Sequence, residues 1–326
     1  WGSGVLKEGL LFFGIGMLLY SVVRLLPNSD EERSNHKWFW GLSAIWFIVF
    51  LTTVKSYALI AIVPGIIALM LNHLIGSIRG TTVVITYSVA ILVGLGVGIL
   101  SPHNSLLQKL ADKQKDFNNL AKGGTYVRKQ SAPFDTLYIF PKGYGGLEIQ
   151  KELEKVLVEE TVTAEKWGVA DGSDNPVFDL QPGTEYDLLL DNGIVGSRIL
   201  IPTLKPDPWT FIKASPAALA NGLLRPFPWE ARSPFMLLAL LENFILMLLI
   251  ILMVIKFNRD NVNWQVWWIA IIFSLTIVLL TGWVTPVIGA IVRYKVPALP
   301  FIAATIVALV SRSWLCAMEK RLSFFG

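Results

Sequence analysis

Five basic residues lie beside long apolar segments of the chain, and their types suit the binding of a phosphate group. They are Lys55, Arg225, Arg232, Arg293 and Lys295. Arginine binds phosphate or carboxylate through a planar, bidentate guanidinium, and lysine binds it as a point charge. At a membrane surface, a lipid-linked phosphate or pyrophosphate is the natural ligand of this chemistry. We therefore predict that these cations, together with Tyr294, form a substrate-binding site.

The same cations have a second interpretation that needs no substrate. Long basic side chains near the end of an apolar helix extend their charged groups to the lipid headgroups. They can also pair with nearby carboxylates, of which Glu8 and Glu230 are the candidates. The two interpretations differ in whether the partner of the cations is a substrate or the membrane and the protein itself.

Two carboxylates are candidates for moving a proton, Glu230 and Glu242. Glu242 lies a third of the way into an apolar segment, where an ionisable residue is costly and faces a bundle interior or a polar cavity. It either holds a neighbouring helix through an Arg or Asn partner or acts as a general base. Arg312 is a candidate counter-ion, although its guanidinium can also extend to the headgroups. We predict that Glu230 or Glu242 accepts the proton of an acceptor hydroxyl.

Other catalytic signatures are missing from the sequence. It contains no G-x-x-x-x-G-K-[ST] motif for cradling a nucleotide phosphate. The glycines from Gly94 lie inside an apolar segment, where small residues permit close helix packing. The histidines His36, His73 and His103 are scattered and lack the spacing of a metal site. We expect neither a metal nor a cofactor.

The composition indicates a membrane protein. Of 326 residues, 53% are hydrophobic and 16% are charged, against about 25% charged in an ordinary soluble domain. Residues 101–233 carry 15 Lys/Arg and 17 Asp/Glu, a net of −2, which leaves 13 and 7, a net of +6, for the other 193 residues. So few and so unevenly placed charges argue against a nucleic-acid partner and favour apolar spans with one polar insert.

Seven apolar segments are long enough, or nearly so, to cross a hydrocarbon core, which takes about 20 helical residues. They are Gly9–Leu26, Trp38–Val54, Tyr57–Ile75, Thr81–Leu100, Pro234–Ile255, Trp264–Val284 and Val296–Met318. Only Lys55-Ser56 separates the second from the third, which predicts a tight helical hairpin. The predicted fold is mainly α, a polytopic transmembrane helical bundle with helices 1–4 in residues 1–100, helices 5–7 in residues 234–326 and a small α+β extracytoplasmic insert in residues 101–233.

The basic residues flanking the spans predict the orientation, since cytoplasmic loops are enriched in Lys and Arg. Eight fall on one side, namely Arg24, Arg33, Lys37, Arg79, Lys256, Arg259, Lys320 and Arg321. Four fall in short loops on the other side, namely Lys7, Lys55, Arg293 and Lys295. The side with eight is predicted to be cytoplasmic, which places the insert and the amino terminus outside. The chain starts at Trp1 without Met or a signal peptide, so we expect it to continue a longer protein with upstream spans.

The insert shows mixed patterns. Apolar residues at helical spacing predict an amphipathic helix from Leu106 to Lys122, ended by Gly123-Gly124. Glu and Lys at surface-pair spacing predict a second helix over Glu148–Glu160. Strands are predicted at Thr136–Phe140, Tyr186–Leu190 and Arg198–Ile201, with a hairpin turn at Asp191-Asn-Gly. The apolar, proline-containing stretch Ala214–Trp229 is predicted to be a re-entrant or interfacial approach to the fifth span.

Four short motifs carry a resemblance that spans nearly the whole chain. They are Gly2-Ser-Gly-Val-Leu-Lys-Glu, Leu224-Arg-Pro-Phe-Pro-Trp-Glu, Leu241-Glu-Asn and Arg293-Tyr-Lys-Val-Pro-Ala-Leu-Pro-Phe. With them the chain resembles a group of bacterial polytopic membrane proteins associated with cell-surface polysaccharide assembly, among O-antigen polymerases and lipid-linked glycosyltransferases. The resemblance implies a bacterial inner membrane and a function that faces the periplasm.

Two hypotheses of function follow. In the first, the protein is a polymerase or glycosyltransferase that uses a polyprenyl-phosphate-linked glycan, whose developing charge the outer cations stabilise. In the second, it is a non-enzymatic membrane subunit of a larger cell-envelope complex, such as secretion or motility machinery, and the cations serve assembly with protein partners. A transporter is less favoured, because no internal repeat or pair of matching broken helices is found.

Overall fold

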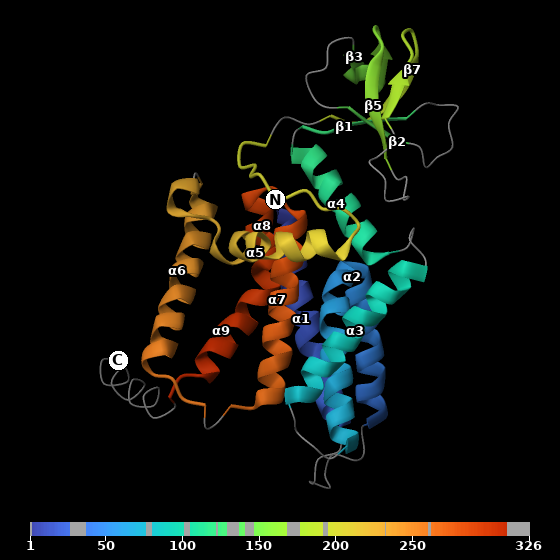
Figure 1. Ribbon diagram of the computed structural model, residues 1–326. Helices are drawn as coiled ribbons and strands as arrows, with labels where there is room; N and C mark the ends of the chain where they lie inside the picture. Colours follow the sequence, from blue (N-terminus) through green and yellow to red (C-terminus); the bar gives the residue numbers. More distant parts are fainter. Residues whose placement is uncertain are drawn as a thin grey trace. The chain divides into compact units, whose positions relative to one another are not determined.

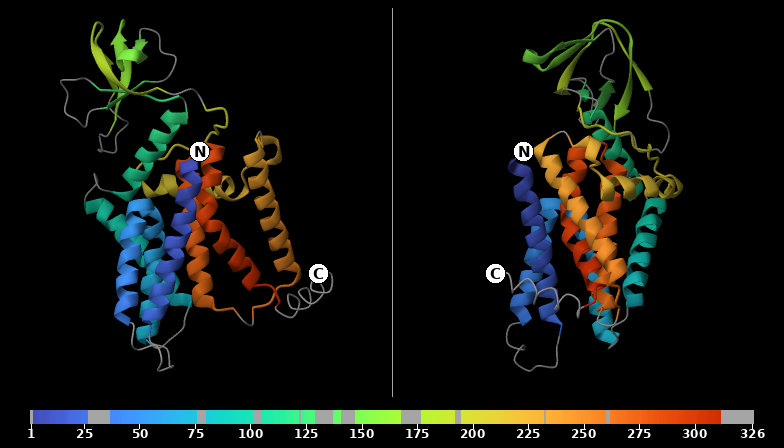
Figure 2. Two further views of the ribbon diagram at one scale, coloured as in Figure 1. Left: turned by 180° about the vertical axis from the view of Figure 1, so that it is seen from behind. Right: turned by 90° about the vertical axis from the view of Figure 1, so that its left-hand side faces the viewer.

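The computed structural model describes residues 2–26, 37–75, 80–100, 105–121, 123–128, 137–140, 147–167, 177–191, 195–231, 233–259 and 262–311. The chain divides into two compact units. Unit 1 comprises residues 1–92, 222–280 and 292–326, and unit 2 comprises residues 93–221 and 281–291. Figure 1 and Figure 2 show long helices in unit 1, and a β-sheet together with the helix α4 (Leu106–Ala121) in unit 2. The division into membrane and insert segments at residues 100 and 233 stays a prediction.

The long helices indicate a multi-pass membrane protein. Among the described residues, five helical stretches are long and apolar enough to cross a membrane, namely Lys37–Lys55, Tyr57–Ile75, Met236–Ile255, Trp264–Val284 and Ile288–Ala308. Two shorter apolar helical stretches, Gly9–Leu25 and Gly80–Gly94, lie where further spans were predicted. The count of seven therefore stays a prediction. The helices α6 (Pro234–Ile255) and α7 (Trp264–Val284) have the bounds expected from the sequence.

The expected break between the second and third spans is confirmed. Helix α2 (Lys37–Ile75) is kinked at Lys55, whose backbone is extended rather than helical. Helix α1 (Gly2–Leu25) packs against α2, because Gly14 leaves room for the side chains of Phe50 and Leu51. A third helix, α3 (Gly80–Leu100), is tied to α2 by the Tyr87 hydroxyl, which donates to the Ala61 carbonyl at 2.9 Å.

The last predicted span lies elsewhere than expected. The helical segment runs from α8 (Ile288–Lys295) through the short turn η5 (Val296–Ala298) into α9 (Leu299–Ala308). Pro297 and Pro300 occupy early positions of η5 and α9, where a missing N–H costs little, so the helical segment continues through them. After α9 the backbone turns, and Val310 forms a bridge with Phe257. The predicted span Val296–Met318 is therefore wrong in two respects: the helical segment begins earlier, at Ile288, and it ends at Ala308 rather than continuing through residues 309–311. Residues 312–318 lie outside the described residues.

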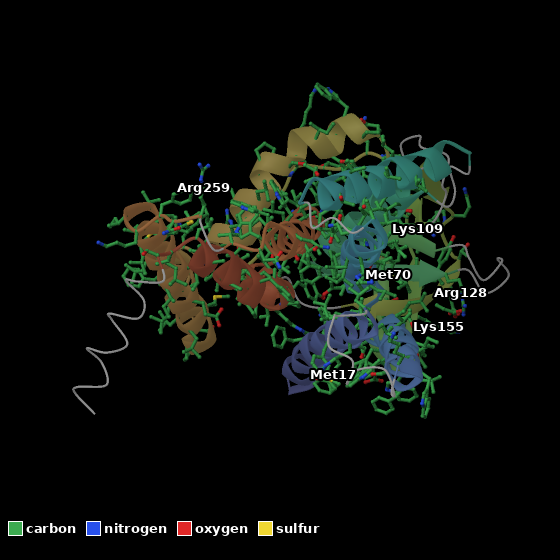
Figure 3. The ribbon with its side chains drawn as sticks, turned by 90° about the horizontal axis from the view of Figure 1, so that it is seen from below. Met17, Met70, Lys109, Arg128, Lys155 and Arg259 are labelled. Atoms are coloured by element: carbon green, nitrogen blue, oxygen red, sulfur yellow. The ribbon has the colours of Figure 1, made fainter. Side chains whose placement is uncertain are left out.

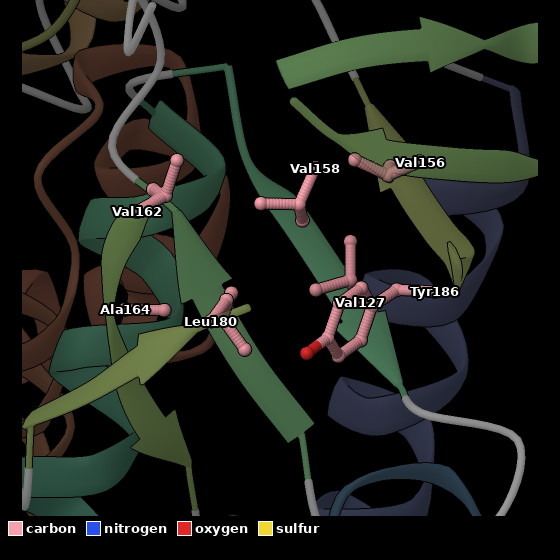
Figure 4. Packing of buried hydrophobic residues seen from close by; sticks show 7 residues of the cluster. All are labelled: Val127, Val156, Val158, Val162, Ala164, Leu180 and Tyr186. Carbon is pink, nitrogen blue, oxygen red and sulfur yellow. The ribbon is translucent and has the colours of Figure 1, made fainter. Parts of the chain in front are cut away.

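Unit 2 contains α4 (Leu106–Ala121) and a seven-stranded sheet. Its strands are β1 (Thr125–Arg128), β2 (Leu137–Phe140), β3 (Leu147–Gln150), β4 (Lys155–Val158), β5 (Val162–Trp167), β6 (Val177–Leu180) and β7 (Glu185–Asp191). Their order is β3-β4-β7-β1-β2-β5-β6, and every neighbouring pair is antiparallel. Alternate side chains bury an apolar cluster, which Figure 4 shows. The predicted helix from Leu106 and the strands near 137–140 and 186–190 are confirmed, and Gly123, at φ 99°, follows the helix.

The predicted helix over Glu148–Glu160 is wrong. The segment is the β3–β4 hairpin, reversed through the turn η3 (Lys151–Leu153) and Glu154 at φ 51°. Its apolar residues alternate with a period of two, so that Val156 and Val158 are buried on one face. The charges that suggested helical pairs act across strands instead, since Lys155 pairs with Glu185 of β7 at 2.7 Å.

The predicted strand Arg198–Ile201 is also wrong as a part of the sheet. Arg198 forms an isolated bridge with Val287, and the Ile199 amide donates to the Pro286 carbonyl at 2.8 Å. Local alternation resembled a strand, but these backbone groups bind the short connection between α7 and α8. The hairpin turn was predicted at residues 191–193; Asp191 ends β7, and residues 192–193 lie outside the described residues.

A buried amide joins distant parts of unit 2. The Gln114 side chain of α4 donates to the carbonyls of Pro202 and Trp283 and accepts from the Leu204 amide, all at 2.7–2.8 Å. Because a buried amide needs such partners, α4 has a fixed position against residues 202–204 and the end of α7. The ring of Trp283 packs edge-on against Phe211 in the same region.

The stretch before the fifth span is helical. Helix α5 (Pro208–Leu224) is followed by the turn η4 (Pro228–Glu230). Two close approaches join α5 to α7: a Cβ on Gly222 would lie 2.7 Å from Val278, and a Cβ on Gly282 would lie 2.0 Å from the Ala218 carbonyl oxygen. Small residues at this crossing let two backbones come together, as in membrane helix pairs. The interfacial location of this stretch stays a prediction.

Candidate functional site

The candidate site lies in unit 1 and is built around the carbonyl groups that follow α5. The Asn243 side-chain amide of α6 donates to the Leu224 carbonyl at 3.0 Å and to the Pro226 carbonyl at 3.5 Å. The Lys295 ammonium donates to the intervening Arg225 carbonyl at 2.8 Å. Three successive carbonyls therefore bind side chains from α6 and α8, which fixes the segment that carries Arg225.

Lys295 is the buried centre of this arrangement. Its side chain is 1% exposed, and its ammonium also donates to the Asn243 side-chain oxygen at 2.6 Å. The sequence placed Lys295 at the outer head of the last span, whereas it lies within the helical segment Ile288–Ala308. A buried lysine is stable only if hydrogen bonds and nearby carboxylates replace its hydration, and Glu242 supplies such a charge interaction.

Arg225 is paired with Glu230, a contact that the second interpretation of the outer cations includes, and its role in substrate binding stays a prediction. The same carboxylate accepts the Phe227 amide at 2.9 Å and thereby caps η4. The guanidinium also lies 5.4 Å from the Phe227 ring centre, and that ring stacks on Trp229 at 4.9 Å. A carboxylate engaged in this way holds a loop in shape, which makes Glu230 a weaker candidate for proton transfer than the sequence suggested.

Lys55 and Arg293 meet at one aromatic ring. The Lys55 ammonium lies 4.9 Å from the centre of the Tyr294 ring and 5.6 Å from that of Tyr57. The Arg293 guanidinium lies 5.9 Å from the Tyr294 centre and its side chain is exposed. Aromatic faces attract cations electrostatically, so Tyr294 gathers one positive charge from the α2 kink and one from α8.

Glu242 is an exposed residue of α6, and it precedes Asn243, whose side chain contacts Lys295. Its carboxylate interacts electrostatically with Lys295. This position allows it to accept a proton from a group bound beside the site. Arg232, the remaining predicted cation, and Arg312, the candidate counter-ion, lie outside the described residues.

The structure thus brings most of the predicted residues into two groups. We name Arg225, Glu230, Glu242 and Lys295, with Asn243, the clamp, and Lys55 and Arg293, with Tyr57 and Tyr294, the cation pair. Asn243 was not predicted as a site residue, although an amide inside an apolar span is a signal that could have revealed it. Within the described part of the chain, no three His, Cys, Asp or Glu residues gather as a metal site.

Comparison with known proteins gives no relative on which to base a function. No family model, curated protein or solved structure matches the chain.

Proposed function

We propose that this membrane protein acts in bacterial surface-polysaccharide assembly, as a polymerase or glycosyltransferase that uses a polyprenyl-phosphate-linked saccharide. The observation that supports the proposal best is the cation pair, because two charges from separate elements meet at Tyr294. A Lys and an Arg that share one aromatic ring are suited to a diphosphate, which carries more charge than either side chain alone neutralises. The inner membrane and a periplasmic site are part of the proposal.

In the proposed reaction, the hydroxyl oxygen of an acceptor sugar bonds to the anomeric carbon of the lipid-linked donor. The bond between that carbon and the phosphate oxygen breaks, and the polyprenyl diphosphate leaves with the electron pair. Lys55 and Arg293 stabilise the negative charge that develops on the leaving group. Glu242 accepts the hydroxyl proton. Arg225, Glu230, Asn243 and Lys295 hold the loop over residues 224–230 in its conformation.

The reaction is tested with the full chain in lipid nanodiscs, a polyprenyl-diphosphate-linked saccharide and mass spectrometry of the products. We expect Arg293→Gln and Glu242→Gln to lower the transfer rate at least tenfold while protein abundance and thermal midpoint stay normal. Arg24→Gln is a matched control for the first, because Arg24 also lies over a tyrosine ring, that of Tyr20. Transfer at the normal rate in both variants would refute the enzymatic proposal.

A second function, that of a non-enzymatic subunit of an envelope complex, is favoured by a different observation. Only 6% of the most apolar stretch of α6 is buried inside the chain. A helix this exposed can pack against a partner helix rather than lipid. Stable copurification of a defined envelope protein that is lost on Leu248→Trp, an exposed position of α6, would support this function. Copurification of a lipid-linked sugar would support the enzyme.

A further inference from the structure

A groove of about 480 Å³ lies in unit 1 between the start of α7 and the end of α9, apart from the candidate site. Small and branched apolar residues make up most of its lining, including Ala270, Ala304, Ala308 and Val310. In Figure 1, α9 runs obliquely toward the connection between α6 and α7. Its volume lies in the range of small-molecule sites, about 300–1,000 Å³.

The polar groups of the lining are already engaged with protein atoms. The Trp267 indole donates to the Thr305 carbonyl at 3.0 Å, and the Thr305 hydroxyl donates to the Ile302 carbonyl at 2.8 Å. The Asn263 side-chain oxygen accepts the Val266 amide at 3.2 Å. The groove therefore offers an apolar surface, and an apolar chain is the ligand that fits it.

Two basic residues border one end of this groove. The Lys256 carbonyl accepts the Ser311 amide at 2.9 Å, next to the lining residue Val310. The Arg259 carbonyl accepts the amide of the lining residue Val262 at 3.4 Å. Figure 3 shows the Arg259 side chain extending from its loop. The backbones of Lys256 and Arg259 therefore lie next to lining residues at this end, which puts two basic residues on the chain that borders the groove.

We propose that this groove binds an anionic phospholipid, with an acyl chain along Ala304 and Ala308 and its phosphate at Lys256 and Arg259. The charge at the border and the apolar lining together select a molecule with a negative head and a hydrocarbon tail. Basic pockets between membrane helices bind anionic lipid headgroups for the same reason, at about 1 kcal/mol, or roughly fivefold, per Lys or Arg. This site is separate from the cation pair and does not depend on the proposed reaction.

The test is native mass spectrometry of the full chain in detergent, with phosphatidylglycerol or the zwitterionic phosphatidylethanolamine added. We expect the wild type to retain phosphatidylglycerol several-fold better. The double variant Lys256→Gln/Arg259→Gln should lose this preference, and Ala308→Trp, which fills the groove, should lower the retention of both lipids. Ala304→Leu adds a smaller side chain to the groove, and it replaces Ala308→Trp in the test if that variant folds poorly. Lys37→Gln, at an exposed lysine of α2, is the matched control and should bind like wild type.

Three results would overturn the proposal. One is equal retention of the two lipids by the wild type. Another is an unchanged preference in the double variant when the thermal midpoint is normal. The third is phosphatidylglycerol retention that appears only after deletion of residues 312–326. That result would mean that the groove of the full chain is occupied by its own C-terminal residues and not by a lipid.

Discussion

The buried Lys295 ammonium joins three segments of unit 1 through two hydrogen bonds and one charge interaction. Lys295→Met keeps the length of the side chain but leaves the Arg225 carbonyl and the Asn243 oxygen without this donor. A buried acceptor without a donor costs about 1–3 kcal/mol. We therefore expect a lower thermal midpoint in detergent, with no such change in Lys213→Met, whose side chain is exposed.

A double-mutant cycle with Asn243→Leu identifies the cause. If the two residues act through their shared hydrogen bond, the second substitution costs less free energy of unfolding in the presence of the first. Strictly additive losses would mean that the two residues do not act through their shared hydrogen bond. A midpoint that Lys295→Met leaves unchanged would mean that the clamp does not stabilise the protein.

For single residues, the sequence indicated which side chains belong to the candidate site better than it indicated their contacts. The sequence indicated Glu230 as a possible partner of the outer cations, and Arg225 pairs with it. Burial of Lys295 depends on where the last helical segment begins, and the predicted span began at Val296, later than the structure has it. The contacts of Asn243 join residues far apart in the chain, and no local pattern specifies them.

At the scale of elements, the crossing of α5 and α7 depends on the absence of a side chain at Gly282. A Cβ there would lie 2.0 Å from the Ala218 carbonyl oxygen, a backbone atom that cannot move alone. Gly282→Ala should therefore separate the helices and lower the thermal midpoint by several degrees. Gly289→Ala is the control, because its added Cβ meets nothing within 4 Å. Equal midpoints for the two variants would contradict the crossing.

The start of α5 should respond to acid. Asp207 accepts hydrogen bonds from the hydroxyl and the amide of Thr210, and these lower the pKa of its carboxyl below the usual 3.8. Since the folded helix favours the charged form, this cap is complete above about pH 4 and is lost as the pH falls through the lowered pKa.

Hydrogen exchange of the first turn of α5, corrected for intrinsic rates, measures this loss. We expect protection to fall in acid for the wild type and to depend far less on pH in Asp207→Asn, which caps without titrating. Protection that is equally pH-dependent in both would assign the acid response to another group.

Helices and strands whose apolar residues follow one clear pattern were predictable from the sequence. Segments in which the spacing of charges and the spacing of apolar residues favour different structures were not. Helices α6 and α7 followed from uninterrupted apolar runs. The β3–β4 hairpin was mistaken for a helix, because charges three and four apart outweighed the alternation of Val156 and Val158. In α4, the buried Gln114 looked like a surface residue, since its partners belong to remote segments.

At the scale of the whole molecule, the orientation is the prediction with the widest consequences. In a Cys316→Ser background, a cysteine at Ser173 should react with a membrane-impermeant maleimide on intact bacteria. One at Ser29 should react only after the membrane is opened, because the flanking basic residues predict a cytoplasmic loop there. The opposite pattern would place the cation pair on the wrong side for a lipid-linked glycan.

The proposed enzymatic function depends on whether Lys55 and Arg293 bind a lipid-linked phosphate. The most direct measurement is the affinity of the full chain, in nanodiscs, for a polyprenyl diphosphate and for the uncharged polyprenol of the same length. We expect the diphosphate to bind at least tenfold more tightly, as about 1.5–3 kcal/mol per charged hydrogen bond implies. The double variant Lys55→Gln/Arg293→Gln should lose that preference, whereas Lys213→Gln, at a lysine over the Trp209 ring, should keep it. Equal affinity of the wild type for the two lipids, or a preference that survives the double substitution, would contradict the account.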